Sequence, residues 1–272
     1  MKTRIIVGLS GLALLLVVVL VLPAMATAIL VAAMSVVAVY ELLIGTGLLK
    51  HVRIFAYCCL MSILVILWSA LGMPRPMGTL MTIVFLLALF GELLAAHAEL
   101  KFRNVCLAIF AGAVLPFLLG ALVRLRYLPN GKFYIITAFL LAMVPDTGAY
   151  FAGSFFGKHK LCPVISPKKT VEGAIGGAVV TVIAMALYTL ILQKAFHFTQ
   201  VNYFYAVLYA LLGTGASMVG DLAFSVIKRQ VKIKDYGKLL PGHGGILDRF
   251  DSTTMVAPLV EALLLVIPFA LK

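Results

Sequence analysis

The chain has 272 residues, of which 63% are apolar and 12% are charged. A soluble domain has about 45–50% apolar and about 25% charged residues, so this composition excludes a soluble globular domain, a disordered chain and a collagen-like chain. One transmembrane helix uses about 20 residues, so nearly the whole chain can lie in a membrane. The net charge of +12 then indicates membrane topology or an anionic substrate, and no nucleic acid is expected.

Apolar runs separated by charged residues or by Pro and Gly predict an all-α polytopic membrane protein with about nine transmembrane helices and cytoplasmic catalytic loops. We expect one transmembrane domain over 1–272, with five spans in 1–132 and four motif-bearing spans in 133–272. The predicted spans lie near 5–22, 24–44, 54–72, 79–96, 105–123, 133–152, 173–193, 202–224 and 254–271. The first run resembles a secretory signal, but its length favours retention as a span.

The distribution of Lys and Arg predicts the orientation. Sixteen of these residues lie at the N-terminus and in alternate loops, against six on the opposite side. The positive-inside rule therefore places the N-terminus and the two long loops, 153–172 and 225–253, in the cytoplasm, and we expect a bacterial inner membrane. These two loops supply the whole asymmetry, and a loop that binds an anionic substrate would be basic for that reason alone.

Several carboxylates stand in apolar surroundings. Asp146 lies inside an apolar run and Asp221 near the end of one, where an ionised carboxylate costs roughly 2.5–3.5 kcal/mol. Asp221, Ser225 and Lys228 are spaced i, i+4 and i+7, so they share one helix face, and Arg229 follows. Such a stripe can serve a metal-bound phosphate, or it can be an internal Asp–Lys pair that closes the helix end.

Asp248 and Asp251 are spaced i, i+3 with Arg249 between them. A helix would place both carboxylates on one face, and Mg²⁺ typically takes one or two carboxylates together with waters and phosphate oxygens. The alternative is that Asp251 caps the last span. By contrast, Glu41, Glu92 and Glu261 are interpreted as structural or snorkelling residues.

Two loop motifs could bind anions. The run Pro241-Gly-His243-Gly244-Gly245 would let backbone N–H groups approach a phosphate, or would form a flexible turn. In the other long loop, Ser166, Lys169 and Thr170 lie just before a span, where hydroxyls, an ammonium group and a helix N-terminus can hold an anion. The Lys168-Lys169 pair could instead be only a topology signal.

These motifs together resemble a known family. The 27 residues 225–251, which run from Ser225-Val-Ile-Lys-Arg to Leu-Pro-Gly-His-Gly-Gly-Ile-Leu-Asp-Arg-Phe-Asp251, look like the signature of phosphatidate cytidylyltransferases, also called CDP-diacylglycerol synthases. Three further stretches resemble the same family: Asp146-Thr-Gly-Ala-Tyr-Phe, Phe156-Gly-Lys-His-Lys-Leu161 and Ser166–Gly173. The resemblance covers roughly 135–255, whereas the first half matches only as hydrophobic spans.

The resemblance implies that the phosphate of phosphatidic acid attacks the α-phosphorus of CTP, forming CDP-diacylglycerol and pyrophosphate. It also implies Mg²⁺, a second cation that could be monovalent, and a homodimer in the membrane lipid. By position, Asp221 and Asp248 would be the principal metal ligands, with Asp251 as a further ligand and Asp146 and Asp235 as weaker candidates. Catalysis is assigned to Asp221, Asp248, Lys228 and Arg249. Substrate binding is assigned to Ser166, Lys169, Thr170, Ser225, Arg229, Lys234, His243, Gly244 and Gly245.

Two alternatives remain open from the sequence. A CTP-dependent enzyme with another phospholipid or an isoprenyl phosphate as acceptor would need the same headgroup chemistry. A membrane transporter would also place charges within spans, but the polar residues cluster at one face and no inverted repeat is evident. Because phosphatidate is already anionic near neutral pH, the enzyme interpretation predicts no nucleophilic side chain and no covalent enzyme intermediate.

Overall fold

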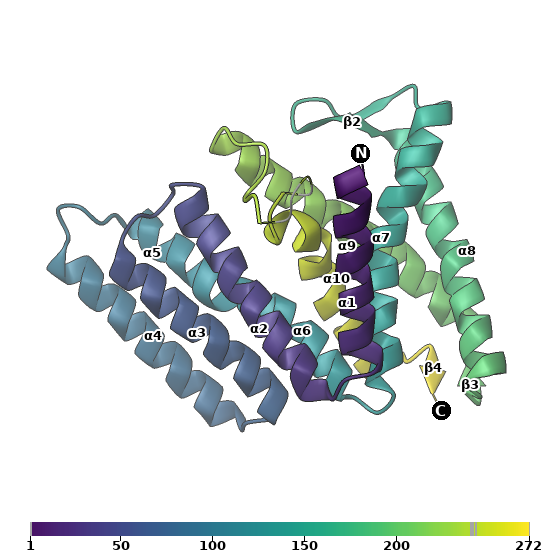
Figure 1. The fold of residues 1–272 in the computed structure, drawn as a ribbon, viewed down its shortest axis with the longest axis horizontal. Helices are drawn as coiled ribbons and strands as arrows, with labels where there is room; N and C mark the ends of the chain where they lie inside the picture. Colours follow the sequence, from purple (N-terminus) through teal and green to yellow (C-terminus); the bar gives the residue numbers. More distant parts are fainter. Residues whose placement is uncertain (1, 240–241, 243, 272) are drawn as a thin grey trace. The chain divides into compact units, whose positions relative to one another are not determined.

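The structure is a computed structural model that describes residues 2–239, 242 and 244–271, without the side chains of 2–7, 9 and 12. It is almost entirely helical (Figure 1). Its helices are α1 (Lys2–Leu20), α2 (Ala24–Tyr40), α3 (Val52–Leu71), α4 (Arg75–Ala95), α5 (Phe102–Ile109), α6 (Leu115–Tyr127), α7 (Gly131–Phe156), α8 (Val171–Ala195), α9 (Tyr203–Gln230) and α10 (Leu247–Val266). Two π-helical turns, η1 (Glu41–Gly45) and η2 (Phe110–Val114), continue α2 and join α5 to α6.

Seven helical segments of the described chain are long and apolar enough to cross a membrane, which agrees with the predicted all-α polytopic class. They are Ala24–Gly45, Val52–Leu71, Arg75–Ala95, Phe102–Tyr127, Gly131–Phe156, Val171–Ala195 and Tyr203–Gln230. Each coincides with one of the predicted spans two to eight. The first and last predicted spans correspond to α1 and α10, which are helices but are not among these seven. The predicted total of nine is therefore not confirmed.

The chain divides into two compact units, which are described separately. Unit 1 comprises Met1–Tyr127 and Val231–Phe250, and unit 2 comprises Leu128–Gln230 and Asp251–Lys272. In unit 1, α3 packs against α2, α4 and α6, as Figure 1 shows. A buried hydrogen bond from Ser62 Oγ to Ser35 Oγ (2.8 Å) joins α2 to α3. Helix α3 ends at Gly72, whose φ of 59° is the left-handed conformation that glycine accommodates at a helix C-terminus.

Unit 2 is built on α7, α8 and α9, which pack against one another. Two hydroxyl groups tie α9 to its other neighbours: Ser217 Oγ donates to the carbonyl of Ala142 in α7, and Ser252 Oγ of α10 donates to the carbonyl of Ser217. Two small antiparallel sheets supplement the helices. Strand β1 (Lys160–Cys162) pairs with β2 (Ser166–Thr170), and β3 (Gln200–Val201) pairs with β4 (Ala270–Leu271).

The β1–β2 hairpin lies in a segment that the sequence leaves as loop. Its last residue, Thr170, is also the N-cap of α8, because the Thr170 hydroxyl accepts a hydrogen bond from the Gly173 N–H (3.1 Å). A side-chain acceptor at this position satisfies one of the N–H groups that a helix leaves unpaired in its first turn. The hairpin is thereby fixed directly to the start of α8.

Glycines allow α7 and α8 to pack closely along their length. A Cβ on Gly177 would lie 2.6 Å from the Pro145 carbonyl oxygen, and a Cβ on Gly148 would lie 2.9 Å from Val180 Cβ. Gly173 and Gly177 are four residues apart on α8, as in the small-residue stripes that let transmembrane helices approach each other. The α7–α8 interface therefore depends on the absence of side chains at these positions.

We expect Gly177→Ala to destabilise the protein by about 1–3 kcal/mol, because the new methyl group overpacks the interface against helix backbone. Gly215→Ala is the matched control in α9, since a Cβ there meets nothing within 4 Å. That control should be neutral or stabilising by up to about 1 kcal/mol, the helix-propensity difference between the two residues. Unfolding of both variants in mild detergent measures the effect, and equal stabilities would contradict the packing argument.

Candidate functional site

Five charged side chains of unit 2 form what we call the acidic cluster: Asp146, Lys169, Asp221, Lys228 and Asp251. Lys169 Nζ forms an ion pair with Asp221 Oδ2, and both side chains are 22% exposed. Lys169 also interacts electrostatically with Asp146, and Asp251 interacts with Asp221 and Lys228. Three carboxylates and two ammonium groups from α7, β2, α9 and α10 thus share one electrostatic environment.

The backbone explains how α9 and α10 bring two of these carboxylates close. A Cβ on Gly220 would lie 2.8 Å from the Asp251 carbonyl oxygen and 3.1 Å from Ser252 Cα. The two helices can therefore touch backbone to backbone immediately beside Asp221. On the other side of the cluster, Arg229 Nε donates to the Ile165 carbonyl in the β1–β2 turn (3.2 Å). This bond ties the end of α9 to the hairpin that carries Lys169.

The charge balance of the acidic cluster favours a bound cation. Asp251 is 7% exposed, and burial, followed by the neighbouring Asp221 charge, raises the pKa of this carboxyl. Ionised together, three carboxylates exceed two lysines by one negative charge. Carboxylate oxygens are also the donors that Mg²⁺ prefers. In the described residues, however, no three His, Cys, Asp or Glu side chains are already arranged as a metal-ligand group, and Lys169 occupies one oxygen of Asp221.

A second set of polar contacts, in unit 1, centres on Glu41. This side chain projects from the π-helical turn η1 and is 2% exposed. Its two carboxylate oxygens accept hydrogen bonds from the backbone N–H groups of Ile246 (3.0 Å) and Leu247 (2.8 Å), where α10 begins. An acid at a helix N-terminus interacts favourably with the unpaired N–H groups and the helix dipole.

Glycines make room for the Glu41 carboxylate. A side chain on either Gly237 or Gly245 would collide with Glu41 Oε1. We call residues 236–247 together with Glu41 the anchored loop. π-Helical turns often occur at functional positions, and here the turn carries the residue that holds this loop.

Asp248 is bound to the same loop. Its Oδ2 accepts hydrogen bonds from the backbone N–H groups of Tyr236 (2.8 Å) and Gly245 (2.9 Å), and the residue is 8% exposed. Gly244 has a φ of 85° and packs against this carboxylate. The loop therefore presents Asp248 in a fixed orientation at the first turn of α10.

The remaining predicted residues have varied settings. Thr170 caps α8 and Arg229 holds the hairpin, so the structure gives both a structural contact. Ser166 pairs with Cys162 in the hairpin, and Ser225 is half-buried on α9. The side chains of Lys234, Asp235 and Arg249 are exposed. His243 and Pro241 lie outside the described residues.

Sequence reasoning missed the role of Glu41. It assigned this residue a structural or snorkelling role because nothing near it in the sequence is polar. The contact joins positions 205 and 206 residues apart, which no local pattern reveals. The one available signal was the acid itself in an apolar run, since such a group needs a partner.

Comparison with known proteins agrees with these motifs. A model described as the cytidylyltransferase family matches residues 2–267. Proteins named phosphatidate cytidylyltransferase from Staphylococcus haemolyticus (strain JCSC1435) and Staphylococcus epidermidis (strain ATCC 12228 / FDA PCI 1200) are each 45% identical to this chain over 136 residues, and one from Staphylococcus aureus (strain COL) is 44% identical. The matched stretch spans 50% of this chain and 50% of each relative. With nearly its whole length matched by the family model, this chain belongs to the cytidylyltransferase family.

Proposed function

We propose that this chain transfers the cytidylyl group of CTP to phosphatidic acid, producing CDP-diacylglycerol and pyrophosphate for phospholipid synthesis. The acidic cluster carries this proposal, because it combines carboxylates and lysines in a membrane protein of the cytidylyltransferase family. The name of the staphylococcal relatives, phosphatidate cytidylyltransferase, supports this choice of nucleotide and acceptor.

The reaction needs positioning and charge neutralisation more than covalent catalysis. An oxygen of the lipid phosphate forms a bond to the α-phosphorus of CTP, and the bond from that phosphorus to the oxygen bridging to the β-phosphate breaks. The attacking oxygen is already anionic, so no side chain has to remove a proton. Lys169 and Lys228 are suited to neutralise phosphate charge, with Arg249 as a further candidate in the first turn of α10.

The carboxylates would hold Mg²⁺. We assign Asp221, Asp248 and Asp251 as its ligands, with Asp146 and Asp235 as weaker candidates. When bound, the ion would bridge phosphate oxygens and reduce the repulsion between the two anionic substrates. For this to occur Asp221 has to exchange its ion pair with Lys169 for the metal, which would leave the Lys169 ammonium group available for a phosphate.

The setting of the reaction forms part of the proposal. The chain is an integral membrane protein, and we place it in the bacterial inner membrane with its active site facing the cytoplasm, where CTP is available and the lipid headgroup is accessible. We also propose a homodimer and a second cation, which could be monovalent. Both rest on the resemblance to the phosphatidate cytidylyltransferase signature.

Purified protein in mild detergent, given phosphatidic acid, labelled CTP and Mg²⁺, should convert label into CDP-lipid with stoichiometric pyrophosphate. EDTA should stop the reaction, and Asp221→Asn and Asp248→Asn should each lower turnover by at least about 100-fold, because each removes a charge that faces the transferred phosphates. CTP binding without conversion of phosphatidate would show that the acceptor is another phospholipid or an isoprenyl phosphate. A folded protein that binds no nucleotide would overturn the enzyme proposal in favour of a transporter.

Two neighbouring lysines of β2 give a matched test of the acidic cluster. Lys169 is half-buried on Asp221, whereas Lys168 is exposed. We expect Lys169→Ala to reduce kcat/KM by about 10- to 100-fold, in the range of a lost charged contact to a transferring phosphate. Lys168→Ala should stay within about twofold of wild type. Equal losses in the two variants would mean that β2 contributes only general positive charge.

Glu41 provides a test of the anchored loop. We expect Glu41→Gln to lower turnover by about 10- to 100-fold, the usual effect of removing a group that orients a ligand-bearing segment. The control is Glu92→Gln, because Glu92 is also an acid in an apolar helix but contacts Tyr57 and Arg53. Turnover and apparent Mg²⁺ affinity are the measurements. A Glu41→Gln enzyme with both values unchanged would exclude the positioning role.

A further inference from the structure

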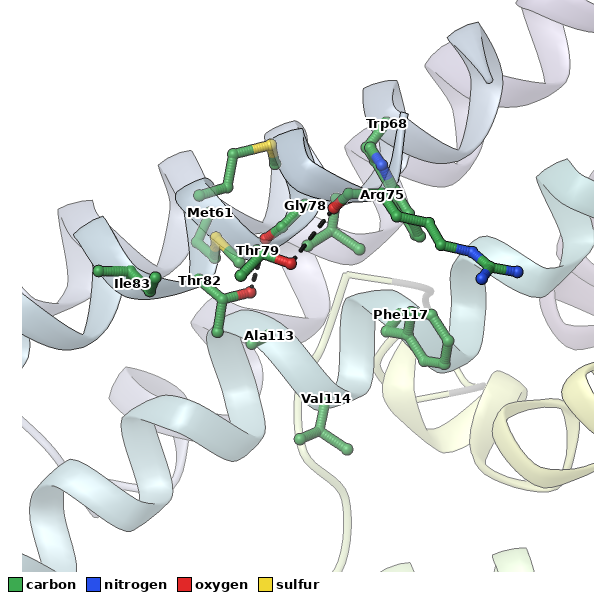
Figure 2. Close-up of a pocket in the computed structure, with 12 residues that line it drawn as sticks. Met61, Trp68, Arg75, Gly78, Thr79, Thr82, Ile83, Ala113, Val114 and Phe117 are labelled. Carbon is green, nitrogen blue, oxygen red and sulfur yellow. Dashed lines mark hydrogen bonds between the residues drawn. The ribbon is translucent and has the colours of Figure 1, made fainter. Parts of the chain in front are cut away.

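An open groove of about 660 Å³ lies in unit 1 between α3, α4 and the η2–α6 segment. Its walls are mainly apolar, and we call it the α3–α4 groove. The residues that matter to the argument are Met61, Trp68, Arg75, Thr82, Ala113 and Phe117. Figure 2 shows Trp68, Arg75 and Phe117 gathered toward one end, with Met61 and Thr82 toward the other. The volume falls within the roughly 300–1,000 Å³ of small-molecule sites.

Arg75 gives this groove a positive end. The residue is exposed in the first turn of α4, and its guanidinium group makes no ion pair or hydrogen bond with any described residue. Arg124 adds positive charge nearby, since its guanidinium lies 4.5 Å from the centre of the Phe117 ring and donates to the Ser69 hydroxyl and the Phe117 carbonyl. Arg124 is therefore held by the protein, whereas Arg75 is available to a ligand.

The groove opens on a helix that the protein hardly covers. Only 11% of the apolar window of α4 is buried, against 28–56% for the other six candidate spans. In a membrane such a surface faces lipid. Trp68 and Arg75 flank the short turn between α3 and α4, and Trp and Arg at the ends of spans lie at headgroup level. The groove thus runs from headgroup level along the hydrocarbon region.

We propose that the α3–α4 groove binds an anionic glycerophospholipid, with one acyl chain along the apolar walls and the phosphate on Arg75. Charge complementarity selects this occupant, because a cation without a protein partner ends a groove that is otherwise apolar. The site uses none of the residues assigned to the transferase reaction. It therefore stands or falls independently of the proposed function.

The protein contains a natural reporter for this site. Trp68 lines the groove and is the single tryptophan of the chain. Its ring packs on α4 at Gly78, where a Cβ would lie 3.2 Å from the indole. Lipids with brominated acyl chains quench tryptophan fluorescence on contact, so quenching of Trp68 measures occupation of the groove directly. The bilayers are symmetric, so the orientation of the protein does not affect the reading.

The full-length protein is reconstituted into vesicles in which brominated phosphatidylglycerol or brominated phosphatidylcholine replaces unlabelled phosphatidylcholine. Wild type should need about fivefold less phosphatidylglycerol than phosphatidylcholine for half-maximal quenching, as expected for one arginine at an anionic headgroup. Arg75→Ala should abolish this preference. Arg103→Ala, which removes an exposed arginine just beyond the other end of α4, should keep it.

A second variant tests the apolar walls. Thr82→Phe adds an aromatic side chain at an exposed position of the groove and should weaken quenching by both lipids, while the unquenched emission maximum reports that α3 and α4 remain packed. Equal quenching of wild type by the two lipids would reduce the groove to ordinary lipid contact and overturn the proposal. Absence of quenching by either lipid would also overturn it, because a second protein copy would then cover Trp68.

Discussion

Two backbone N–H groups at the start of α10 point at a carboxylate that projects from the end of α2, and this contact organises unit 1. Glu41 has almost no exposure to water, so its oxygens must find donors inside the protein. Ile246 and Leu247 supply them, and Gly237 and Gly245 leave the space. The glycine-rich stretch is thus a loop shaped around an acid, and Asp248 takes its orientation from that loop.

Unit 2 meets the same requirement with side-chain cations. Asp221 is paired with Lys169, which reaches it from a hairpin held on both sides: Thr170 is committed to α8, and the turn is bonded to Arg229 at the end of α9. Because α7 and α8 are in close contact at their glycines, the helices that carry the cluster have little freedom to separate. Fixed charges of this kind suit phosphate chemistry, since they need no rearrangement as charge moves.

Much of this arrangement could be predicted from the sequence, and the limits have physical causes. Hydropathy located the seven candidate spans, because each is a continuous apolar run. Charged residues in such runs, together with the 225–251 signature, identified the acids and lysines of the acidic cluster. The β1–β2 hairpin was missed because its strands are short and polar. Glu41 was missed because its partners lie more than 200 residues away in the chain.

Helix α10 shows why hydropathy alone could not settle the number of spans. It carries Asp248, Arg249, Asp251 and Glu261 within 20 residues, and these charges remove it from the set of candidate spans. The structure nonetheless forms the helix, because the backbone bonds of its first turn are completed by Glu41 and its second turn packs against Gly220.

The close approach at Gly220 has a consequence for how this family can vary. The separation of α9 and α10 beside Asp221 is set by an atom that is missing, since any Cβ at 220 would meet the Asp251 carbonyl and Ser252. A substitution there would alter the coupling between two acids without touching either. Position 220 is therefore a spacer whose mutational tolerance reflects the electrostatics of its neighbours rather than any chemistry of its own.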